Sequence, residues 1–229
     1  MSEKITRLQE FIAKEMLGKT TIKVLEAGCG SMSHLRFDQE VYTVGIDISE
    51  KQLQRNIKLN ERILGDIQHY HFQPSSFDLV VCWDVLEHLP DPDLVLHKFV
   101  GSVREKGIIV LKMPNVLSLK GLVTKLLPYP LHILFYKKVH GRQKAGEDDR
   151  GPFRTYLRFS IAPTAIKKFA KNNGLRVTYY DTFDASATNW LQRNKMVLIV
   201  YKTLNAFIKC VSFGTISDSD FVIVLQKAT

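Results

Sequence analysis

The fold is decided by the stretch Val24-Leu25-Glu26-Ala27-Gly28-Cys29-Gly30, in which apolar residues lead into two glycines separated by one residue. Its apolar part belongs to the run Ile22–Ala27, which predicts a buried strand that ends in a tight turn. Glycine has no Cβ, so the backbone of such a turn can come close to another group. A strand that ends in this way is typical of the first unit of a parallel α/β sheet.

The rest of the chain repeats the alternation of strands and helices. Further strands are predicted at 41–46, 62–64, 77–82, 108–113, 175–180 and 221–225. Helices are predicted near the N-terminus, at 49–60, where Ser49 and Gln52 form a capping box, at 92–103 and at 163–173. We therefore expect a doubly wound, Rossmann-like α/β fold. It would have a seven-stranded, mostly parallel sheet with helices on both faces, and its ligand would lie at the carboxyl ends of the strands.

Two inserts interrupt this pattern within what we expect to be a single domain over residues 1–229, opened by a helix within residues 1–20. The first insert, 116–153, mixes apolar and basic residues and then carries the acidic run Glu147-Asp148-Asp149. The second, 184–220, contains the apolar stretch Met196–Cys210. Long insertions in a compact domain often serve a substrate. We expect both to act as substrate lids.

Composition excludes several classes of protein. The three cysteines are widely spaced, which gives neither a disulfide framework nor a zinc motif and fits a reducing compartment. The first residues show no secretory signal, and no apolar run is long enough for a bilayer span, so we expect a cytoplasmic protein. The net charge of +9 fits a lysine-rich surface. No aromatic and basic RNA signature accompanies it, so a nucleic-acid partner is not expected.

The glycine turn resembles the E-x-G-x-G motif of class I methyltransferases that use S-adenosylmethionine (SAM). In that family the turn passes under the methionine part of SAM, which implies cofactor binding by Gly28, Cys29 and Gly30 and places Glu26 near the amino group. On the residues alone, a tight turn that simply needs glycine is an alternative. A dinucleotide site is another, but it requires a third glycine, for helix packing, where Ser33 stands.

Two further acidic positions follow predicted strands. Asp47, with Ile48 after it, ends the second strand, and its carboxylate can accept hydrogen bonds from both ribose hydroxyls. Ser49 is the better helix cap, so we expect Asp47 to be free for the ribose. The resemblance implies that Asp66 receives the adenine amino group and that Ile67 packs on the ring. A surface turn is the alternative for Asp66, but it does not predict the spacing from Asp66 to Asp78, which matches the family's pattern without a gap.

The segment 76–89 resembles the fourth strand of the same family and the loop after it. The resemblance places Trp83 near the adenine or sulfonium side of SAM and lets Glu87-His88-Leu89 face the transfer site. We expect Asp78, at the start of this strand, to support the neighbouring strands and not to bind ligand.

The resemblance covers 24–115 well and implies methyl transfer from SAM, with S-adenosylhomocysteine as the product. We expect a hydroxyl of a small molecule, natural product or glycan as the acceptor. Such an acceptor needs a base, and His88 is our candidate because its ordinary pKa lies near neutral pH. Packing of the loop is an equal alternative for His88. Further candidate bases are His140, Asp148, Asp149 and Tyr156, although a solvated loop explains them more simply. No carboxylate and amide cluster suggests a metal, so none is expected.

The inserts leave other functions open. Leu117–Val139 and Met196–Cys210 combine apolar residues with lysines, which fits peripheral membrane contact and a lipid-linked substrate. A hydrophobic lid or a homodimer face is the interpretation we prefer. An amine acceptor is a further possibility. A SAM-fold binding module without catalysis is disfavoured, because Glu26, Gly28, Gly30 and Asp47 are all present.

Overall fold

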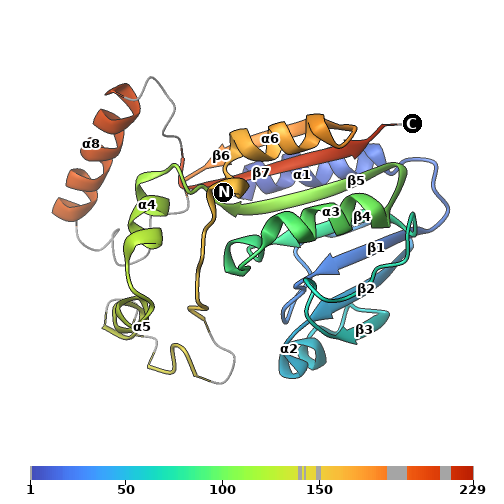
Figure 1. Cartoon of the computed structure of the whole chain (residues 1–229), viewed down its shortest axis with the longest axis horizontal. Helices are drawn as coiled ribbons and strands as arrows, with labels where there is room; N and C mark the ends of the chain where they lie inside the picture. The colour runs from blue at the N-terminus through green and yellow to red at the C-terminus, as the bar shows by residue number, and fades with distance from the viewer. Residues whose placement is uncertain are drawn as a thin grey trace.

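The computed structural model of the chain describes residues 2–138, 141, 143–147, 151–184, 195–211 and 218–228. A seven-stranded sheet in the order β3-β2-β1-β4-β5-β7-β6 forms its centre (Figure 1). In this sheet β7 pairs antiparallel with β5 and β6, and the other pairs are parallel. The predicted Rossmann-like sheet is confirmed. The strands are β1 (Ile22–Ala27), β2 (Val41–Asp47), β3 (Glu61–Leu64), β4 (Phe77–Trp83), β5 (Val103–Pro114), β6 (Leu175–Phe183) and β7 (Asp220–Lys227).

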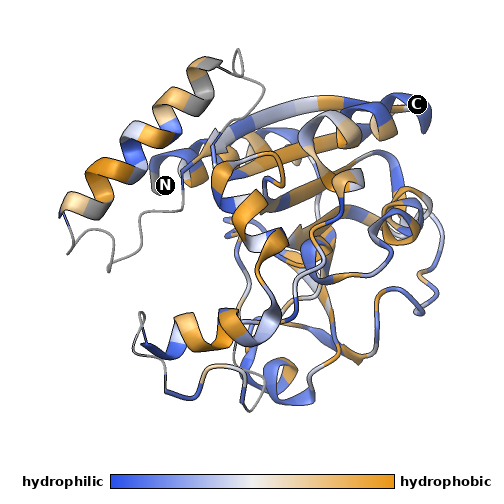
Figure 2. Ribbon diagram, turned by 60° about the vertical axis from the view of Figure 1, so that its left-hand side comes forward, coloured by the Kyte–Doolittle hydropathy of each residue, from blue (hydrophilic) through white to orange (hydrophobic). Residues whose placement is uncertain are grey.

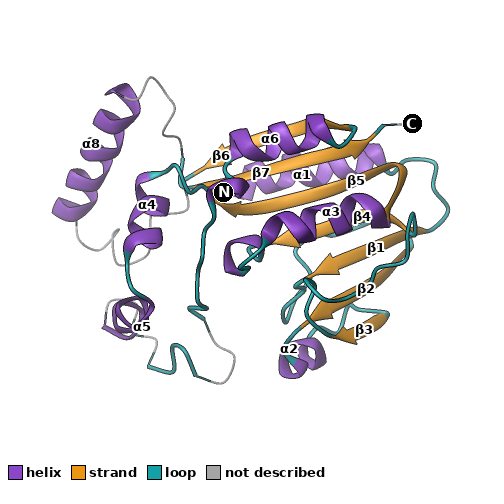
Figure 3. Ribbon diagram, viewed as in Figure 1, coloured by secondary structure: helices purple, strands orange, loops and turns teal. Residues whose placement is uncertain are grey.

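Helices cover both faces of the sheet (Figure 3). The predicted N-terminal helix is α1, and it buries Leu8 and Ile12, with Met16 directly after it, against one face together with side chains of β1, β4 and β5. On the opposite face, α3 and α6 pack over a second apolar core. Four helices surround the sheet in this way: α1 (Ser2–Glu15), α2 (Glu50–Arg55), α3 (Pro92–Ser102) and α6 (Pro163–Asn172).

Some predicted boundaries are wrong, and tertiary contacts explain why. The helix predicted at 49–60 ends at Arg55, because the Arg62 guanidinium donates hydrogen bonds to the carbonyls of Leu53 and Asn56 at 3.0 and 2.9 Å. These carbonyls at the helix end are thus satisfied by a side chain. β5 begins at Val103, before the predicted start at 108, because Val103 pairs with Phe77 across a register shift. Residues 28–40 form no helix.

The inserts contribute three described helices, α4 (Leu119–Leu126), α5 (Tyr129–Lys138) and α8 (Lys195–Val211). Both inserts leave the same edge of the sheet, because Asp220 at the start of β7 pairs with Pro114 of β5 and with Phe183 of β6. This is the edge where the parallel strands end. Within the described part of the chain, no helix combines the length and the apolar character needed to cross a membrane.

Candidate active site

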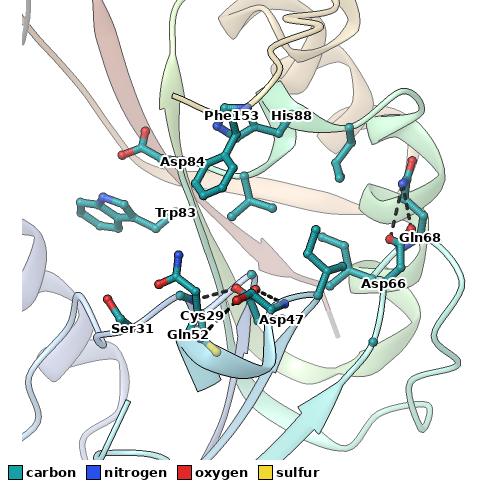
Figure 4. A pocket seen from close by; sticks show the side chains of 18 of the residues that line it. Cys29, Ser31, Asp47, Gln52, Asp66, Gln68, Trp83, Asp84, His88 and Phe153 are labelled. Carbon is teal, nitrogen blue, oxygen red and sulfur yellow. Dashed lines mark hydrogen bonds between the residues drawn. The ribbon is translucent and has the colours of Figure 1, made fainter. Parts of the chain in front are cut away.

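A cavity of about 650 Å³ lies at the carboxyl ends of β1, β2, β3 and β4 (Figure 4). Nine of the ten residues predicted to bind the cofactor or to act as the base line it, and Glu26 is the exception. These residues are Gly28, Cys29, Gly30, Asp47, Ile48, Asp66, Ile67, Trp83 and His88. The fold therefore gathers residues that are spread over 61 positions of the sequence, between 28 and 88, around one space.

The two glycines of the turn after β1 have different structural roles. Gly28 has φ +70°, and a Cβ at this position would lie 2.4 Å from a methyl carbon of Val85. Gly28 thus lets the turn pack against the loop after β4, whereas the sequence suggested only a close approach to ligand. Gly30, with φ +54°, is open, since the nearest atom to a Cβ there is Gln52 Oε1 at 3.9 Å. The space beside the Cα of Gly30 is therefore open, and Gly30 lines the cavity.

Glu26 lies behind this turn and does not line the main cavity. Its side chain is buried, and its carboxylate accepts a hydrogen bond from the Ser33 hydroxyl at 2.7 Å. Burial raises the pKa of Glu26 despite this bond. Ser33, which replaces the third glycine of a dinucleotide fingerprint, is thus part of the support beneath the turn.

Asp47 is not free, contrary to the sequence-based expectation. Its Oδ2 accepts a hydrogen bond from the Gly30 N–H and its Oδ1 accepts one from the Ser49 N–H, both at 2.9 Å. Ser49 caps α2 as predicted, by accepting a bond from the Gln52 N–H. Each carboxylate oxygen of Asp47 keeps a second acceptor position, so two ribose hydroxyls can still be bound. The extra bonds fix the carboxylate at the junction of β1 and β2.

Asp66 is held in a similar way after β3. Its Oδ1 accepts a bond from the Gln68 N–H at 2.8 Å, and its Oδ2 lies 3.1 Å from His69 Nδ1. Partial burial opposes ionisation, but the bonds from Gln68 and His69 outweigh it, so the pKa of Asp66 is lowered. The adjacent Ile67 is buried and gives this part of the cavity an apolar wall.

The end of β4 adds an aromatic ring and a third carboxylate. The Trp83 ring stacks on His34, with ring centres 5.0 Å apart and planes inclined by 9°. Asp84 also lines the cavity, which the sequence did not predict. Its φ of +54° is rare for a residue with a side chain, and its carboxylate pairs with Lys112 at 2.5 Å. Lys112 in turn bonds to Asp220 at 3.0 Å, which anchors this loop to β5 and β7.

Asp78 supports the strands, as predicted. It lies at the amino end of β4, away from the cavity, and its carboxylate pairs with Lys19 at 2.7 Å and Arg104 at 2.8 Å. It also accepts a hydrogen bond from the Lys23 N–H of β1. Partial burial opposes ionisation, but bonds from Lys19, Lys23 and Arg104 prevail and lower the pKa of Asp78.

His88 combines several features of a base. Its Nδ1 lies 2.9 Å from the carbonyl oxygen of Arg154, and its ring packs edge-on to Phe153. Because a carbonyl oxygen only accepts hydrogen bonds, Nδ1 carries the proton of the neutral ring and Nε2 is left as the basic nitrogen. Burial lowers the pKa of His88, so the ring is neutral at neutral pH.

Glu87 does not face the transfer site, which corrects the sequence-based expectation. The turn Leu86–His88 is a short 3₁₀ helix that directs Glu87 inward, where it is buried. Burial, together with the nearby charge of Asp84, raises the pKa of Glu87 well above its usual range. The Glu87 carbonyl accepts hydrogen bonds from the N–H groups of Tyr156 and Leu157 at 2.8 and 3.0 Å. The backbone of Glu87 therefore ties the segment just after the first insert to the loop after β4.

The hydrogen bonds to the Glu87 carbonyl place residues in the cavity that the sequence did not predict. Phe153 and Arg154 line it, as does Tyr156, which the sequence offered only as an alternative base. No local pattern marks these positions, because backbone bonds to a segment almost seventy residues earlier place them. The other alternative bases, His140, Asp148 and Asp149, lie outside the described residues.

The comparisons with known proteins agree on one family. A family model described as "Methyltransferase domain" matches residues 1–180. An uncharacterized protein of Methanocaldococcus jannaschii is 33% identical over 109 residues, which are 47% of this chain and 48% of that protein. The ubiquinone biosynthesis O-methyltransferase of Pseudomonas aeruginosa is 30% identical over 111 residues, 44% and 48% of the two chains. The chain thus spans about half the length of the curated relatives it matches.

The fold comparison extends further along the chain. The crystal structure of a SAM-dependent methyltransferase from Archaeoglobus fulgidus has a TM-score of 0.56. This likeness covers 99% of this chain and 94% of that one at 16% sequence identity. The whole chain, inserts included, is therefore compatible with the architecture of that structure.

Proposed function

This chain belongs to the methyltransferase-domain family, and from that premise we propose that it transfers the methyl group of SAM to a hydroxyl group of a small molecule, natural product or glycan. The observation that carries the proposal is the position of His88. The side chain lies in the same cavity as the cofactor residues carried over from the resemblance, with Nδ1 bonded to a carbonyl and Nε2 left basic.

The donor side of the cavity suits SAM better than a dinucleotide. Asp47, Asp66 and Asp84 line it, and these carboxylates favour a donor with a positively charged sulfonium. A dinucleotide site holds its pyrophosphate at the N-terminus of the helix that follows the glycine turn. Residues 28–40 form no such helix here. The glycine turn would hold the methionine part of SAM, Asp47 the ribose and Asp66 the adenine amino group.

The reaction is an in-line displacement at the methyl carbon. The acceptor oxygen forms a bond to that carbon, the carbon–sulfur bond breaks, and its electron pair stays on sulfur to give neutral S-adenosylhomocysteine. The hydroxyl proton passes to Nε2 of His88. Holding donor and acceptor in near-attack geometry lowers the barrier by up to about 7–11 kcal/mol.

A hydroxyl acceptor is favoured over an amine by two observations. A neutral amine can attack without prior loss of a proton, so a base with a lowered pKa beside the donor has its clearest use with a hydroxyl. One relative that matches half of this chain is named as an O-methyltransferase. A lipid-linked hydroxyl compound is the second candidate acceptor, and the apolar helices of the inserts favour it.

The test has two steps. Calorimetry should show binding of SAM and S-adenosylhomocysteine, and weaker binding of NAD. Labelled SAM is then offered with a panel of hydroxylated metabolites, sugars and amines, and methyl transfer to a hydroxyl is expected. Preferential NAD binding would overturn the function, and transfer only to amines would overturn the choice of acceptor.

A further inference from the structure

Three helices stand at the edge of the sheet that holds the cavity. α4, α5 and α8 belong to the two inserts, which both leave the sheet where β5 ends beside the start of β7. Figure 1 shows them on one side of the molecule, apart from the helices that cover the sheet. We call α4, α5 and α8 together the insert face.

The insert face exposes many large apolar side chains, which appear as orange segments along α8 and α5 in Figure 2. Ten of the 21 exposed large hydrophobic side chains in the described part of the chain belong to it, two on α4, three on α5 and five on α8. Exposed apolar patches of this kind mark interaction surfaces. The residues are Val123, Leu126, Leu131, Leu134, Phe135, Met196, Ile199, Val200, Leu204 and Phe207.

The apolar stripe of α8 points away from the protein. Among the residues of α8 whose burial the structure describes, the half-buried ones recur three or four positions apart, so they lie on one face; they are Leu198, Tyr201 and Asn205. Val200 and Phe207, which are 65% and 64% exposed, fall on the opposite side of the helix. A helix whose outer side meets only water normally shows the reverse, with its apolar side toward the core.

The charge of the insert face has a single sign. Its three helices contain seven lysines and neither aspartate nor glutamate, although the chain has 23 acidic residues. Lys195 and Lys202 are exposed and lie seven positions apart, so both border the same side of the apolar stripe. Lys138 at the end of α5 is exposed as well. Amphipathic helices with this combination bind at the surface of anionic bilayers.

We propose that the insert face docks on an anionic lipid bilayer, with the apolar stripe of α8 at the interface and its exposed lysines at the level of the phosphates. A second copy of the chain is a poorer occupant, because a symmetric contact would bring the same lysines together with no acidic partner on these helices. The docking does not depend on the reaction. The further proposal that docking presents the cavity to a hydroxylated amphiphile rests on the proposed function.

The first test is flotation of the full chain with vesicles of phosphatidylcholine, with and without phosphatidylglycerol. We expect flotation with the anionic vesicles, weakened by salt because exposed charges are screened. Wild-type chain that floats with neither vesicle overturns the proposal. A dimer would also overturn it. In that case light scattering would show concentration-dependent dimers of the wild type, and the double variant Val200→Asp/Phe207→Asp would be a monomer.

The second test compares that variant with a matched control. Val200→Asp/Phe207→Asp places two carboxylates on the apolar stripe and should lower the vesicle-bound fraction at least about tenfold. Leu17→Asp/Ile57→Asp makes the same change in net charge at two apolar residues that are 73% and 86% exposed outside the insert face. It should bind like wild type, and an equal loss in both variants overturns the proposal. Circular dichroism checks that each variant is folded, and SAM binding by calorimetry reports on the cavity separately.

Discussion

The two sides of the cavity are built in different ways. The side that we propose for the donor consists of short turns at the ends of β1, β2 and β3, where Asp47 and Asp66 are each fixed by bonds from nearby N–H groups. The side that we propose for the acceptor consists of His88 and of Phe153, Arg154 and Tyr156, which lie at or just after the end of the first insert. One side is fixed by its own turns, and the other by contacts between distant segments.

The difference separates two properties of the enzyme. A donor common to a whole family needs the same backbone geometry every time, so it is bound by turns that strand order creates. An acceptor differs from one enzyme to the next, and loops can change without disturbing the sheet. Substitutions on the donor side should therefore reduce SAM affinity, and those on the acceptor side should reduce turnover.

The largest effect is expected at His88. His88→Ala should lower turnover by about 10²–10⁴-fold, because it removes the proton acceptor, while SAM affinity changes little. The control is His71→Ala, at an exposed histidine that does not line the cavity. Single-turnover kinetics with a confirmed hydroxyl acceptor measure the rate. Near-normal turnover of His88→Ala would place the base elsewhere and make Tyr156, His140, Asp148 and Asp149 the next candidates.

The pH dependence of the wild-type rate gives a second test of His88 as the base. Burial lowers the pKa of His88, so the neutral, basic form persists to lower pH than in a free histidine. The rate should fall on the acid side with a midpoint below that of a free histidine, and His88→Ala should lose this limb.

The next largest effect is expected at Gly28 on the donor side. Gly28→Ala combines a left-handed φ of +70° with a Cβ placed 2.4 Å from Val85, so the turn must shift. We expect a loss of about 2–5 kcal/mol, divided between stability and SAM binding. Gly101→Ala is the matched control, since Gly101 lies inside α3 and its Cβ would meet nothing within 4 Å. It should be neutral or stabilise by about 0.5–1 kcal/mol. Urea unfolding and calorimetry measure both, and equal behaviour of the two variants would contradict this role of Gly28.

The same division explains what the sequence could predict. The donor side was predictable because each residue there answers a local requirement, such as a positive φ at Gly30 or an acceptor at the end of β2. The Rossmann-like sheet was predictable because its strands are short apolar runs separated by turns. Nine of the ten predicted site residues line the cavity for these reasons.

The acceptor side was not predictable because its geometry depends on the tertiary structure. A 3₁₀ turn directs the Glu87 side chain inward, and the Glu87 carbonyl accepts bonds from two N–H groups of the distant segment just after the first insert. Phe153 and Arg154 follow from that same contact. The end of α2 likewise depends on Arg62, a residue of the next strand that bonds the last helical carbonyls. No window of local sequence contains both partners of the contact between Glu87 and the insert.

A smaller effect is expected at Asp47. Asp47→Ala should lower SAM affinity by about 1–3 kcal/mol, because two ribose hydroxyls lose their acceptors. It also leaves the N–H groups of Gly30 and Ser49 without this carboxylate, so a lower melting temperature should accompany the loss. The control is Asp38→Ala, which removes an exposed carboxylate from a nearby loop that does not line the cavity. Unchanged SAM affinity of Asp47→Ala in calorimetry would refute the ribose assignment.

The smallest effect is expected from a chelator, which should leave the rate unchanged. A base at Nε2 of His88 can take the hydroxyl proton without help from a metal ion, and the carboxylates of Asp47 and Asp84 already bond to N–H groups and to Lys112. In the ranges that the structure describes, no three His, Cys, Asp or Glu side chains are grouped so as to hold a metal. The measurement is the initial rate with EDTA and then with added magnesium. A rate that EDTA abolishes and magnesium restores would contradict this prediction. Metal ligands would then be sought in the first insert, beginning with substitutions of Asp148 and Asp149. SAM binding should be unaffected by EDTA in either case, because the residues proposed to hold SAM act through their own side chains and backbone, and that separates a metal needed by the acceptor from one needed by the fold.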